Sequence, residues 1–265
     1  MADERYTWSA IRASAYTDVR TFGQPRHTDV LIVVFDASRS FLGRAAWTQL
    51  RRWYRKHGRH GLPWRKDRNP WRVLLAETVL HRTRADMAAA LYPQLVREFP
   101  DPQAVLRRPD LWYELVWPAG LAWRAQAFLA CCGILTERFG GHVPSDQAAL
   151  EGLPGVGHYV AQAVRCFGFG IRTPLVDTNT IRLASRISGL SASQERHRSR
   201  AVQQLVACLA EENRPPDDDD NFALLDLAAL VCLPRSPSCE TCPLRLDCAT
   251  GRTRAITKVR AARQR

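Results

Sequence analysis

The sequence predicts an all-α protein, and two observations support that prediction. From Phe41 onward, apolar residues recur mainly with helical spacing, and no convincing strand follows residue 42. A helix start is also explicit at Asn69-Pro70, because Asn is a favoured N-cap and Pro a favoured first helical residue. The 265 residues, 46% of them hydrophobic, can form two small lobes around a shared cleft.

The pattern divides the chain into four parts. Residues 1–42 form an N-terminal extension of unknown role that contains a strand candidate at Val30–Phe35, and residues 43–231 form the helical domain. A cysteine loop over 232–248 and a basic tail over 249–265 follow. After the helix that begins at Asn69-Pro70, further helices are expected over 86–98, 102–108, 110–116, 123–139, 146–151, 158–168, 179–188, 197–212 and 222–231.

Charge predicts a polyanionic partner. The net charge is +12 and the isoelectric point about 9.9, which suits nucleic acid. Residues 251–265 carry basic and no acidic side chains and are expected to form a disordered arm that touches DNA. The acidic run Asp217–Asp220 follows two prolines and is expected to be a solvated loop. No apolar run is long enough to span a membrane and the N-terminus does not resemble a secretory signal, so we expect a cytoplasmic or nucleoid-associated protein.

Four cysteines near the C-terminus indicate a metal centre. Their spacing is C-x6-C-x2-C-x5-C, and soft sulfur ligands of that number suit an iron–sulfur cluster or zinc. Zinc and disulfides remain open at this point, although the wide outer gaps differ from the paired CxxC units of a zinc ribbon. The ligands are Cys232, Cys239, Cys242 and Cys248, while the other four cysteines, Cys131, Cys132, Cys166 and Cys208, are expected in the core.

A glycine-rich turn precedes a predicted helix at about His158. In Leu153-Pro-Gly-Val-Gly157, Gly155 and Gly157 allow a tight turn and a close approach of backbone to a ligand. The free N–H groups at the start of the following helix then favour a phosphate. A tight turn without a ligand is the alternative reading.

The motifs, taken together, resemble the helix-hairpin-helix DNA glycosylases of the endonuclease III and adenine-glycosylase branch. The Leu153–Gly157 hairpin, Val176-Asp-Thr-Asn179 and the cysteine loop occur in that family's order, and the resemblance covers about residues 45–250. Upstream, Leu62-Pro-Trp-Arg65 and Glu77–Thr83 resemble the adenine and thymine-mismatch subfamilies. The resemblance implies a two-lobed fold, a [4Fe–4S] cluster, a monovalent cation at the hairpin, and a monomer that binds double-stranded DNA with a mismatched or damaged base.

The resemblance also assigns the chemistry. Asp177 matches the family's essential carboxylate and Glu77 the glutamate that assists the departing base, and two carboxylates in one cleft can divide such roles. The alternatives are a helix cap for Asp177 and an ion pair with Arg84 or Arg182 for Glu77. Glycosylase/lyases carry a Schiff-base lysine two positions after the hairpin, where this chain has Tyr159. Tyr159 is therefore expected as a third catalytic-site residue that stacks on the flipped base or forms a wall of its pocket, and a tyrosine that merely packs is the alternative.

These assignments predict a monofunctional glycosylase that removes thymine or uracil opposite guanine. Adenine glycosylase, a glycosylase for another modified base and a non-catalytic DNA-binding module are the alternatives; only a short segment follows Cys248, which disfavours the extra domain of adenine enzymes. In the family, the positions of His81 and Arg82 wedge the duplex where the target base has left, and Trp123 and Arg124 fall where a second wedge is inserted. Core packing is the alternative for Trp123, and an unpaired guanine is the expected partner of Arg124. The residues expected to contact DNA are Gly155, Gly157, His81, Arg82, Trp123, Arg124, Asn179 and Arg182.

Overall fold

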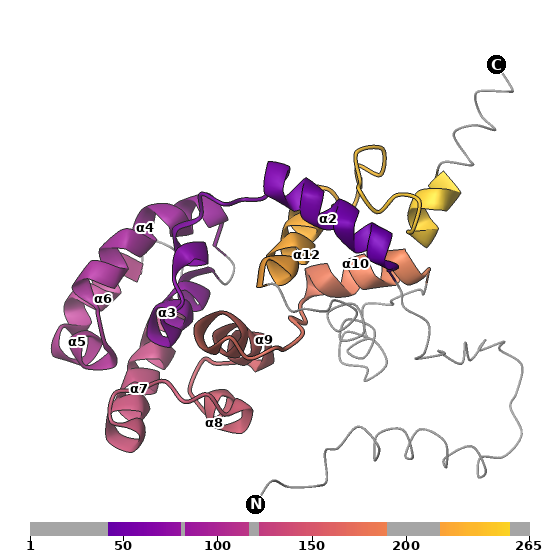
Figure 1. Cartoon of the computed structure of the whole chain (residues 1–265). Coiled ribbons are helices and arrows are strands. Elements are labelled where there is room, and N and C mark those ends of the chain that lie inside the picture. The colour runs from indigo at the N-terminus through magenta and orange to yellow at the C-terminus, as the bar shows by residue number, and fades with distance from the viewer. Residues whose placement is uncertain (1–41, 81–82, 117–121, 190–217, 255–265) are drawn as a thin grey trace, which may run out of the picture. The chain divides into compact units, whose positions relative to one another are not determined.

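The computed structural model describes residues 42–80, 83–116, 122–189 and 218–254. Within these ranges every regular element is helical, so the prediction of an all-α fold is confirmed (Figure 1). The strand candidate at Val30–Phe35 and the predicted helix over 197–212 lie outside the described residues. No helix in the described ranges has the length and apolar character needed to cross a membrane.

Up to α10 the helices follow one another with short connections, and residues 190–217, between α10 and α12, are outside the described ranges. In chain order they are α2 (Arg44–His57), η2 (Pro63–Lys66), α3 (Pro70–Leu80), α4 (Ala85–Glu98), α5 (Pro102–Arg107), α6 (Pro109–Val116), α7 (Ala122–Phe139), α8 (Gln147–Glu151), α9 (His158–Ala163), η4 (Val164–Gly168), α10 (Thr178–Ser188) and α12 (Asp218–Leu230).

Polar side chains define several helix starts. The Asn69 Oδ1 atom accepts a hydrogen bond from the Arg72 N–H at 3.2 Å, as the sequence predicted for α3. Asp101 and Asp146 cap α5 and α8 in the same way, with acceptor distances of 2.6 and 2.8 Å to the third backbone N–H of each helix. These caps satisfy donors that would otherwise lack partners, and they fix where each helix begins.

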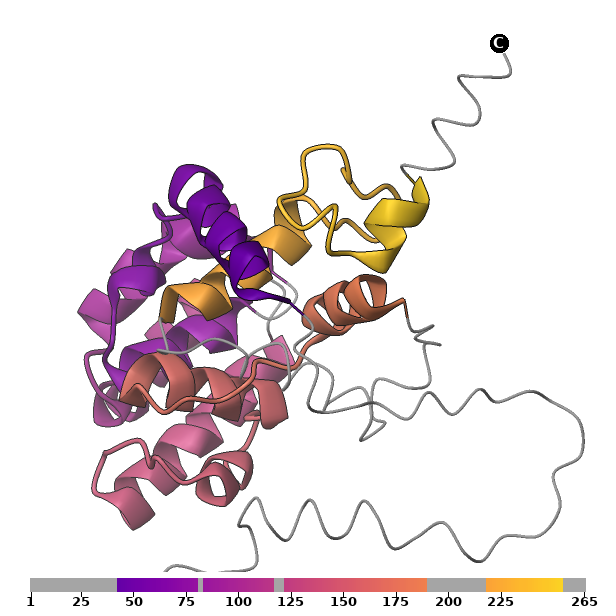
Figure 2. The ribbon, with the colours of Figure 1, turned by 45° about the vertical axis from the view of Figure 1, so that its right-hand side comes forward.

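The helices pack in two groups. In the first, α3 contacts α4, α9, η4 and η2, while α7 packs against α5 and α6. In the second, α12 packs against both α2 and α10, and both views show α2 lying across α12 (Figures 1 and 2). The segments that carry the predicted catalytic residues, α3, α9 and the start of α10, therefore come from both groups.

Aromatic rings fill the centre of the first group. Trp112 stacks on Phe128 with ring centroids 4.8 Å apart and meets Phe99 edge-on, and Trp71 stacks on the other side of Phe128. The indole N–H of Trp71 donates to the Phe99 carbonyl and that of Trp112 to the Ala125 carbonyl. The large rings bury much apolar surface while both polar tips keep a partner. Cys131, Cys132 and Cys166 are buried, as expected.

Three sequence expectations need correction. Asp218–Asp220 do not form a solvated loop: they begin α12, and the buried Asp220 binds Arg51 of α2 through two hydrogen bonds of 2.8 and 3.0 Å. Acidic residues suit a helix N-terminus because its exposed N–H groups carry partial positive charge.

Residues 249–254 are helical and so are not part of a disordered tail.

The third correction concerns the helix expected over 158–168. The α-helix α9 ends at Ala163, and the chain continues as the π-helical turn η4. Gly168 closes this turn against Pro70, so closely that an added Cβ would lie 2.8 Å from the Pro70 Cα atom. A side chain at position 168 would push α3 and η4 apart.

We predict that Gly168→Ala destabilises the fold by about 1–3 kcal/mol, because the methyl group would overlap the backbone of Pro70. The matched control is Gly133→Ala within α7, where an added Cβ meets nothing within 4 Å. That change should stabilise by roughly 0.5–1 kcal/mol, because alanine is the better helix former. Denaturant unfolding of both variants tests this, and equal effects would contradict the packing argument.

Candidate active site and cysteine loop

A cavity of about 610 Å³ opens between the two groups of helices. It receives side chains from η2, α3, α9, the start of α10 and α12. Three predicted catalytic residues and one predicted DNA-binding residue share its wall, namely Glu77, Tyr159, Asp177 and Asn179. The fold therefore brings together residues separated by up to a hundred positions in the chain.

Asp177 is the N-cap of α10. Its Oδ1 atom accepts hydrogen bonds from the backbone N–H groups of Asn179 (2.9 Å) and Thr180 (2.7 Å), and its Oδ2 atom accepts one from the Asn179 side chain (2.7 Å). The Thr180 hydroxyl completes a capping box by accepting from the Asp177 N–H. Capping and lining the cavity thus coexist in one residue, and the cap fixes the orientation of the carboxylate.

Glu77 lies on α3 with only 9% of its surface exposed. Burial, and next the negative charge of Asp177, raise the pKa of this carboxyl from 4.5 to about 7. In the described part of the chain no arginine pairs with it: Arg84 binds Asp86, and Arg182 donates elsewhere. Glu77 is therefore a carboxyl group that holds a proton in a substantial fraction of molecules at neutral pH.

Tyr159 is half-buried and lines the same cavity as these two acids. Burial and the negative charges of Glu77 and Asp177 raise the pKa of its phenol well above 10, and the nearby Arg65 opposes that shift only in part. The side chain is thus a neutral hydroxyl at physiological pH. It can donate or accept a hydrogen bond, but it offers no amine to a sugar.

The hairpin has the geometry that the sequence predicted. Gly155 adopts a φ of +79°, which favours glycine, and the Val156 N–H donates to the Leu153 carbonyl at 3.1 Å. Gly157 caps α9 without any side chain, and an added Cβ there would meet nothing within 4 Å. The start of α9 is therefore open to an approaching group.

The predicted wedge residues behave differently from one another. Trp123 is 61% exposed, so the alternative that it packs in the core is wrong. Arg124 is buried, donates to the Thr78 carbonyl at 3.3 Å, and places its guanidinium 4.9 Å from the centre of the Trp123 ring. His81 and Arg82 lie outside the described residues.

Arg182 joins the Asp177 cap to the cysteine loop. It donates to the Asn179 side-chain oxygen at 3.0 Å and to the carbonyls of Ala228 and Cys232 at 2.8 and 2.9 Å. Three of its nitrogens are thus engaged inside the protein. This position makes Arg182 a structural brace between the cap and the cysteine loop, and its contact with DNA stays a prediction.

The four cysteines of the loop face one small apolar cavity. Arg186 donates to the Cys232 sulfur at 3.3 Å, and the Gly251 N–H donates to that of Cys248 at 3.4 Å. Burial raises the pKa of the Cys242 thiol to about 11, so a metal must displace its proton to bind. Within the described ranges no three His, Cys, Asp or Glu side chains converge on a point suited to one metal ion.

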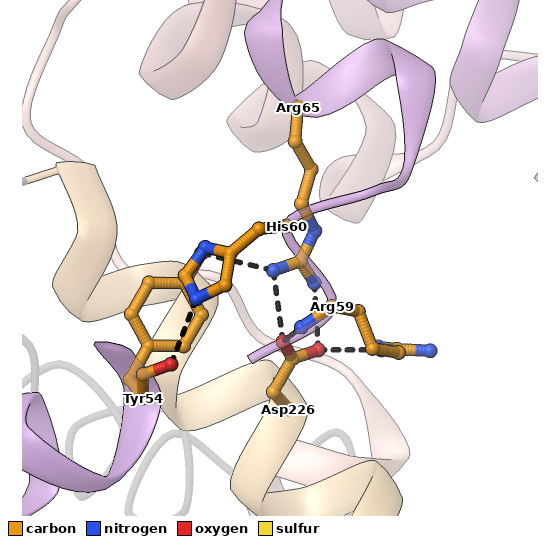
Figure 3. Close-up of polar contacts among 5 residues, drawn as sticks. All are labelled: Tyr54, Arg59, His60, Arg65 and Asp226. Atoms are coloured by element: carbon orange, nitrogen blue, oxygen red, sulfur yellow. Dashed lines mark hydrogen bonds and ion pairs between the residues drawn. The ribbon is translucent and has the colours of Figure 1, made fainter. Parts of the chain in front are cut away.

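One buried group behind the cavity-lining residues Arg59 and Arg65 escaped the sequence analysis. Asp226 on α12 is fully buried and binds both Arg59 and Arg65 (Figure 3). The available signal was an aspartate inside the apolar run Phe222–Leu230, since a buried carboxylate needs a partner. The sequence could not name that partner, because both arginines lie more than 160 positions away.

Sequence comparison places this geometry in a known family. No protein-family model matches the chain. The thymine-DNA glycosylase of Aeropyrum pernix is 33% identical over 215 residues, which cover 78% of this chain and 96% of that protein. The chain belongs to the helix-hairpin-helix DNA glycosylase superfamily. It is therefore a DNA glycosylase of base excision repair.

Other members of the superfamily are similarly related. The thymine/uracil-DNA glycosylase of Pyrobaculum aerophilum is 35% identical over 199 residues, covering 73% of this chain and 85% of that protein. The adenine DNA glycosylase of Mycobacterium tuberculosis is also 35% identical, over 207 residues, but the match covers only 65% of that protein. Identity alone thus does not separate the thymine/uracil and adenine branches.

Solved structures agree with the fold. The structure of a thermostable thymine-DNA glycosylase aligns with a TM-score of 0.70 at 28% identity, covering 78% of this chain and 95% of that one. A trapped endonuclease III–DNA covalent intermediate aligns with a TM-score of 0.66 at 21% identity, a level at which the likeness concerns the fold alone. The glycosylase fold expected from the hairpin and its flanking motifs is confirmed.

We predict that Glu77→Gln stabilises the glycosylase at alkaline pH. The folded-state pKa of about 7 lies above the unfolded value of about 4.5, so ionised Glu77 costs stability as pH rises through this window. The glutamine variant should be more stable than wild type by up to about 3 kcal/mol at pH 8, and equal to it near pH 4. Urea unfolding at the two pH values measures this, and a pH-independent difference would contradict the assignment.

Proposed function

We propose that this glycosylase removes thymine or uracil from mismatches with guanine in double-stranded DNA and leaves an abasic site. The observation that carries the proposal is that Tyr159 lines the same cavity as Glu77 and Asp177 and lies close enough to feel both charges. The neutral phenol of Tyr159 lines the cavity at the position where lyases have a lysine, and this supports hydrolysis by water. Thymine and uracil are the bases named for two of the similar glycosylases.

The cavity supplies the groups that hydrolysis of an N-glycosidic bond needs. Positive charge develops on the deoxyribose as the bond breaks, and the capped carboxylate of Asp177 is fixed where it can stabilise that charge or accept a proton from water. Glu77, with its pKa of about 7, can donate a proton or hydrogen bond to the departing base. The two carboxyl groups, one held by hydrogen bonds and one buried on α3, thus take different roles.

Lyase chemistry finds no support in the cavity. The chain has no lysine between Lys66 and Lys258, and among the residues that line the described cavity there is no lysine. A Schiff base with the sugar requires such an amine. We therefore propose a monofunctional enzyme.

Three features predicted to contact DNA are the start of α9, Trp123 and Arg124. They suit a monomer that bends the duplex and flips the target base. The open start of α9 after Gly157 can accept a backbone phosphate or a monovalent cation that bridges to one. The exposed Trp123 ring can fill the gap left in the base stack, with Arg124 stacked behind it.

We also propose that Cys232, Cys239, Cys242 and Cys248 hold a [4Fe–4S] cluster. The four cysteines all line one small apolar cavity, and N–H groups donate to two of their sulfurs, a pattern that suits clustered iron better than isolated thiols. When bound, the cluster would order the loop that presents Arg235, Arg245 and Arg252 at the surface.

The proposed activity is tested with duplexes that carry T·G, U·G, A·G or A·8-oxoguanine. Strand cleavage should occur with T·G and U·G, and only after hot alkali opens the abasic site. Cleavage without alkali would overturn the monofunctional assignment. Excision of adenine in place of thymine and uracil would move the enzyme to the adenine branch.

We predict that Asp177→Asn lowers base release by at least about 100-fold, because the carboxylate charge is lost. The fold should persist, since asparagine is also a strong N-cap and can keep the bonds to Asn179 and Thr180. Single-turnover excision and a DNA-binding titration measure the two effects separately. Normal turnover by a folded variant would refute the role of Asp177.

A further inference from the structure

Arg186 lies in the last turn of α10, and its side chain reaches the start of the cysteine loop. Its Nη1 atom donates to the carbonyls of Cys232 and Leu233 at 3.3 and 2.7 Å, and its Nη2 atom donates to the Pro234 carbonyl at 2.6 Å. One guanidinium thus holds three successive backbone carbonyls. A lysine at this position would not do the same, because an ammonium lacks the fork of N–H groups that a guanidinium offers.

The same guanidinium also donates to a sulfur. The Nη1 atom of Arg186 lies 3.3 Å from the Cys232 Sγ atom, and Arg186 lines the small apolar cavity together with all four cysteines of the loop. Cys248, the last of the four, contacts Arg186 from the other end of the loop, because its thiol donates to the Arg186 carbonyl at 3.1 Å. A single residue of α10 therefore contacts the first and the last cysteine of the set.

Close packing keeps the end of α10 next to the loop. Gly189, the C-cap of α10, has a φ of +81°, and a Cβ added there would lie 3.0 Å from the Ala249 Cβ atom. Both views show this end of α10 beside the loop and the short helix that follows it (Figures 1 and 2). The Arg186 side chain thus extends from a backbone that is itself packed against the residue after Cys248.

The positive charge of Arg186 has no acidic partner among the described residues. Its hydrogen bonds there go to three carbonyls and one sulfur, and none goes to a carboxylate. The carbonyl end of a helix carries partial negative charge, which disfavours thiolates beside it. A guanidinium at that end offsets this effect and forms a stronger hydrogen bond with a charged acceptor than with a neutral one. The end of α10 is therefore suited to a ligand set that carries negative charge.

We propose that Arg186 is a positioning residue for the iron–sulfur cluster, which holds Cys232 in place and stabilises the negative charge on its sulfur. This inference rests on the proposed assignment of the four cysteines and adds a residue that their spacing does not reveal. Donors to a ligand atom fix its orientation and adjust the electronic properties of the metal centre. Hydrogen bonds to cysteine sulfurs raise the reduction potential of an iron–sulfur cluster, because they stabilise its more reduced and more negative state.

The test uses the holoenzyme and the variant Arg186→Met, which keeps an apolar stem but lacks the charge and the donors. The variant should lose its cluster to an iron chelator about 10–100-fold faster than wild type, because contacts that orient metal ligands contribute on that scale. Its reduction potential should be more negative, because the donor to the Cys232 sulfur is gone. Decay of the visible absorption of the cluster measures the first effect, and voltammetry measures the second.

Two further variants separate charge from geometry. Arg186→Lys keeps the positive charge but cannot bind three carbonyls at once, so its potential should lie closer to that of wild type while its cluster is still lost faster. The matched control is Arg235→Met, which removes an exposed cation from the same loop. It should leave the rate of loss and the potential close to those of wild type.

The outcomes distinguish this inference from the assignment on which it rests. Equal rates of loss and equal potentials for Arg186→Met and Arg235→Met would refute the role of Arg186. Faster loss without a change in potential would also refute it, because the arginine would then support only the fold of the loop. Purified wild type without iron and inorganic sulfide would instead refute the cluster assignment itself.

A variant that cannot be isolated with a cluster still leaves a decisive comparison. If Arg186→Met takes up no iron, the rate of cluster loss is compared between Arg186→Lys and wild type, and an unchanged rate would refute the inference. Circular dichroism of every variant shows that the measurements belong to folded protein.

Discussion

The start of α10 is the constraint on which the candidate site depends. Asp177 satisfies the first N–H groups of that helix with one carboxylate oxygen and the Asn179 side chain with the other, so its position follows from helix geometry. From Asn179 the contacts continue through Arg182 to the carbonyls of Ala228 and Cys232. The carboxylate in the cavity, the end of α12 and the first residue of the cysteine loop therefore form one connected unit.

The two acids of the cavity, Asp177 and Glu77, lie in different surroundings. Asp177 is held by hydrogen-bond donors, whereas Glu77 sits on the apolar helix α3, where burial and the charge of Asp177 raise its pKa to about 7. The difference arises because a helix N-terminus offers free N–H groups and a helix interior offers none. One cleft thus holds the hydrogen-bonded carboxylate of Asp177 beside Glu77, which can carry a proton. Tyr159, which lines the same cleft, adds no charge of its own.

A second buried acid joins distant segments beside the cavity. Asp226 of α12 is fully buried and pairs with Arg59 and Arg65, which both line the cavity, while about a third of the Arg59 side chain stays exposed. Buried ion pairs contribute little net stability, because desolvation offsets their attraction. What this cluster determines is how α12 packs against the segment that contains the two arginines.

The sequence alone determined the all-α class, the starts of α3 and α9, the hairpin turn at Gly155 and the four-cysteine spacing. These features depend on neighbouring residues, through caps, glycine conformations and periodicity, so local chemistry suffices to predict them. The family resemblance named Glu77, Tyr159 and Asp177 together, and the fold places all three at one cavity. Only the tertiary structure decided that Asp220 and Asp226 bind arginines of α2 and the segment that follows it, that Arg182 braces the loop, and that α9 gives way to a π-turn at Pro70. Each of these depends on partners far away in the chain, and no local pattern encodes which distant residue will fill a buried space or pair a buried charge.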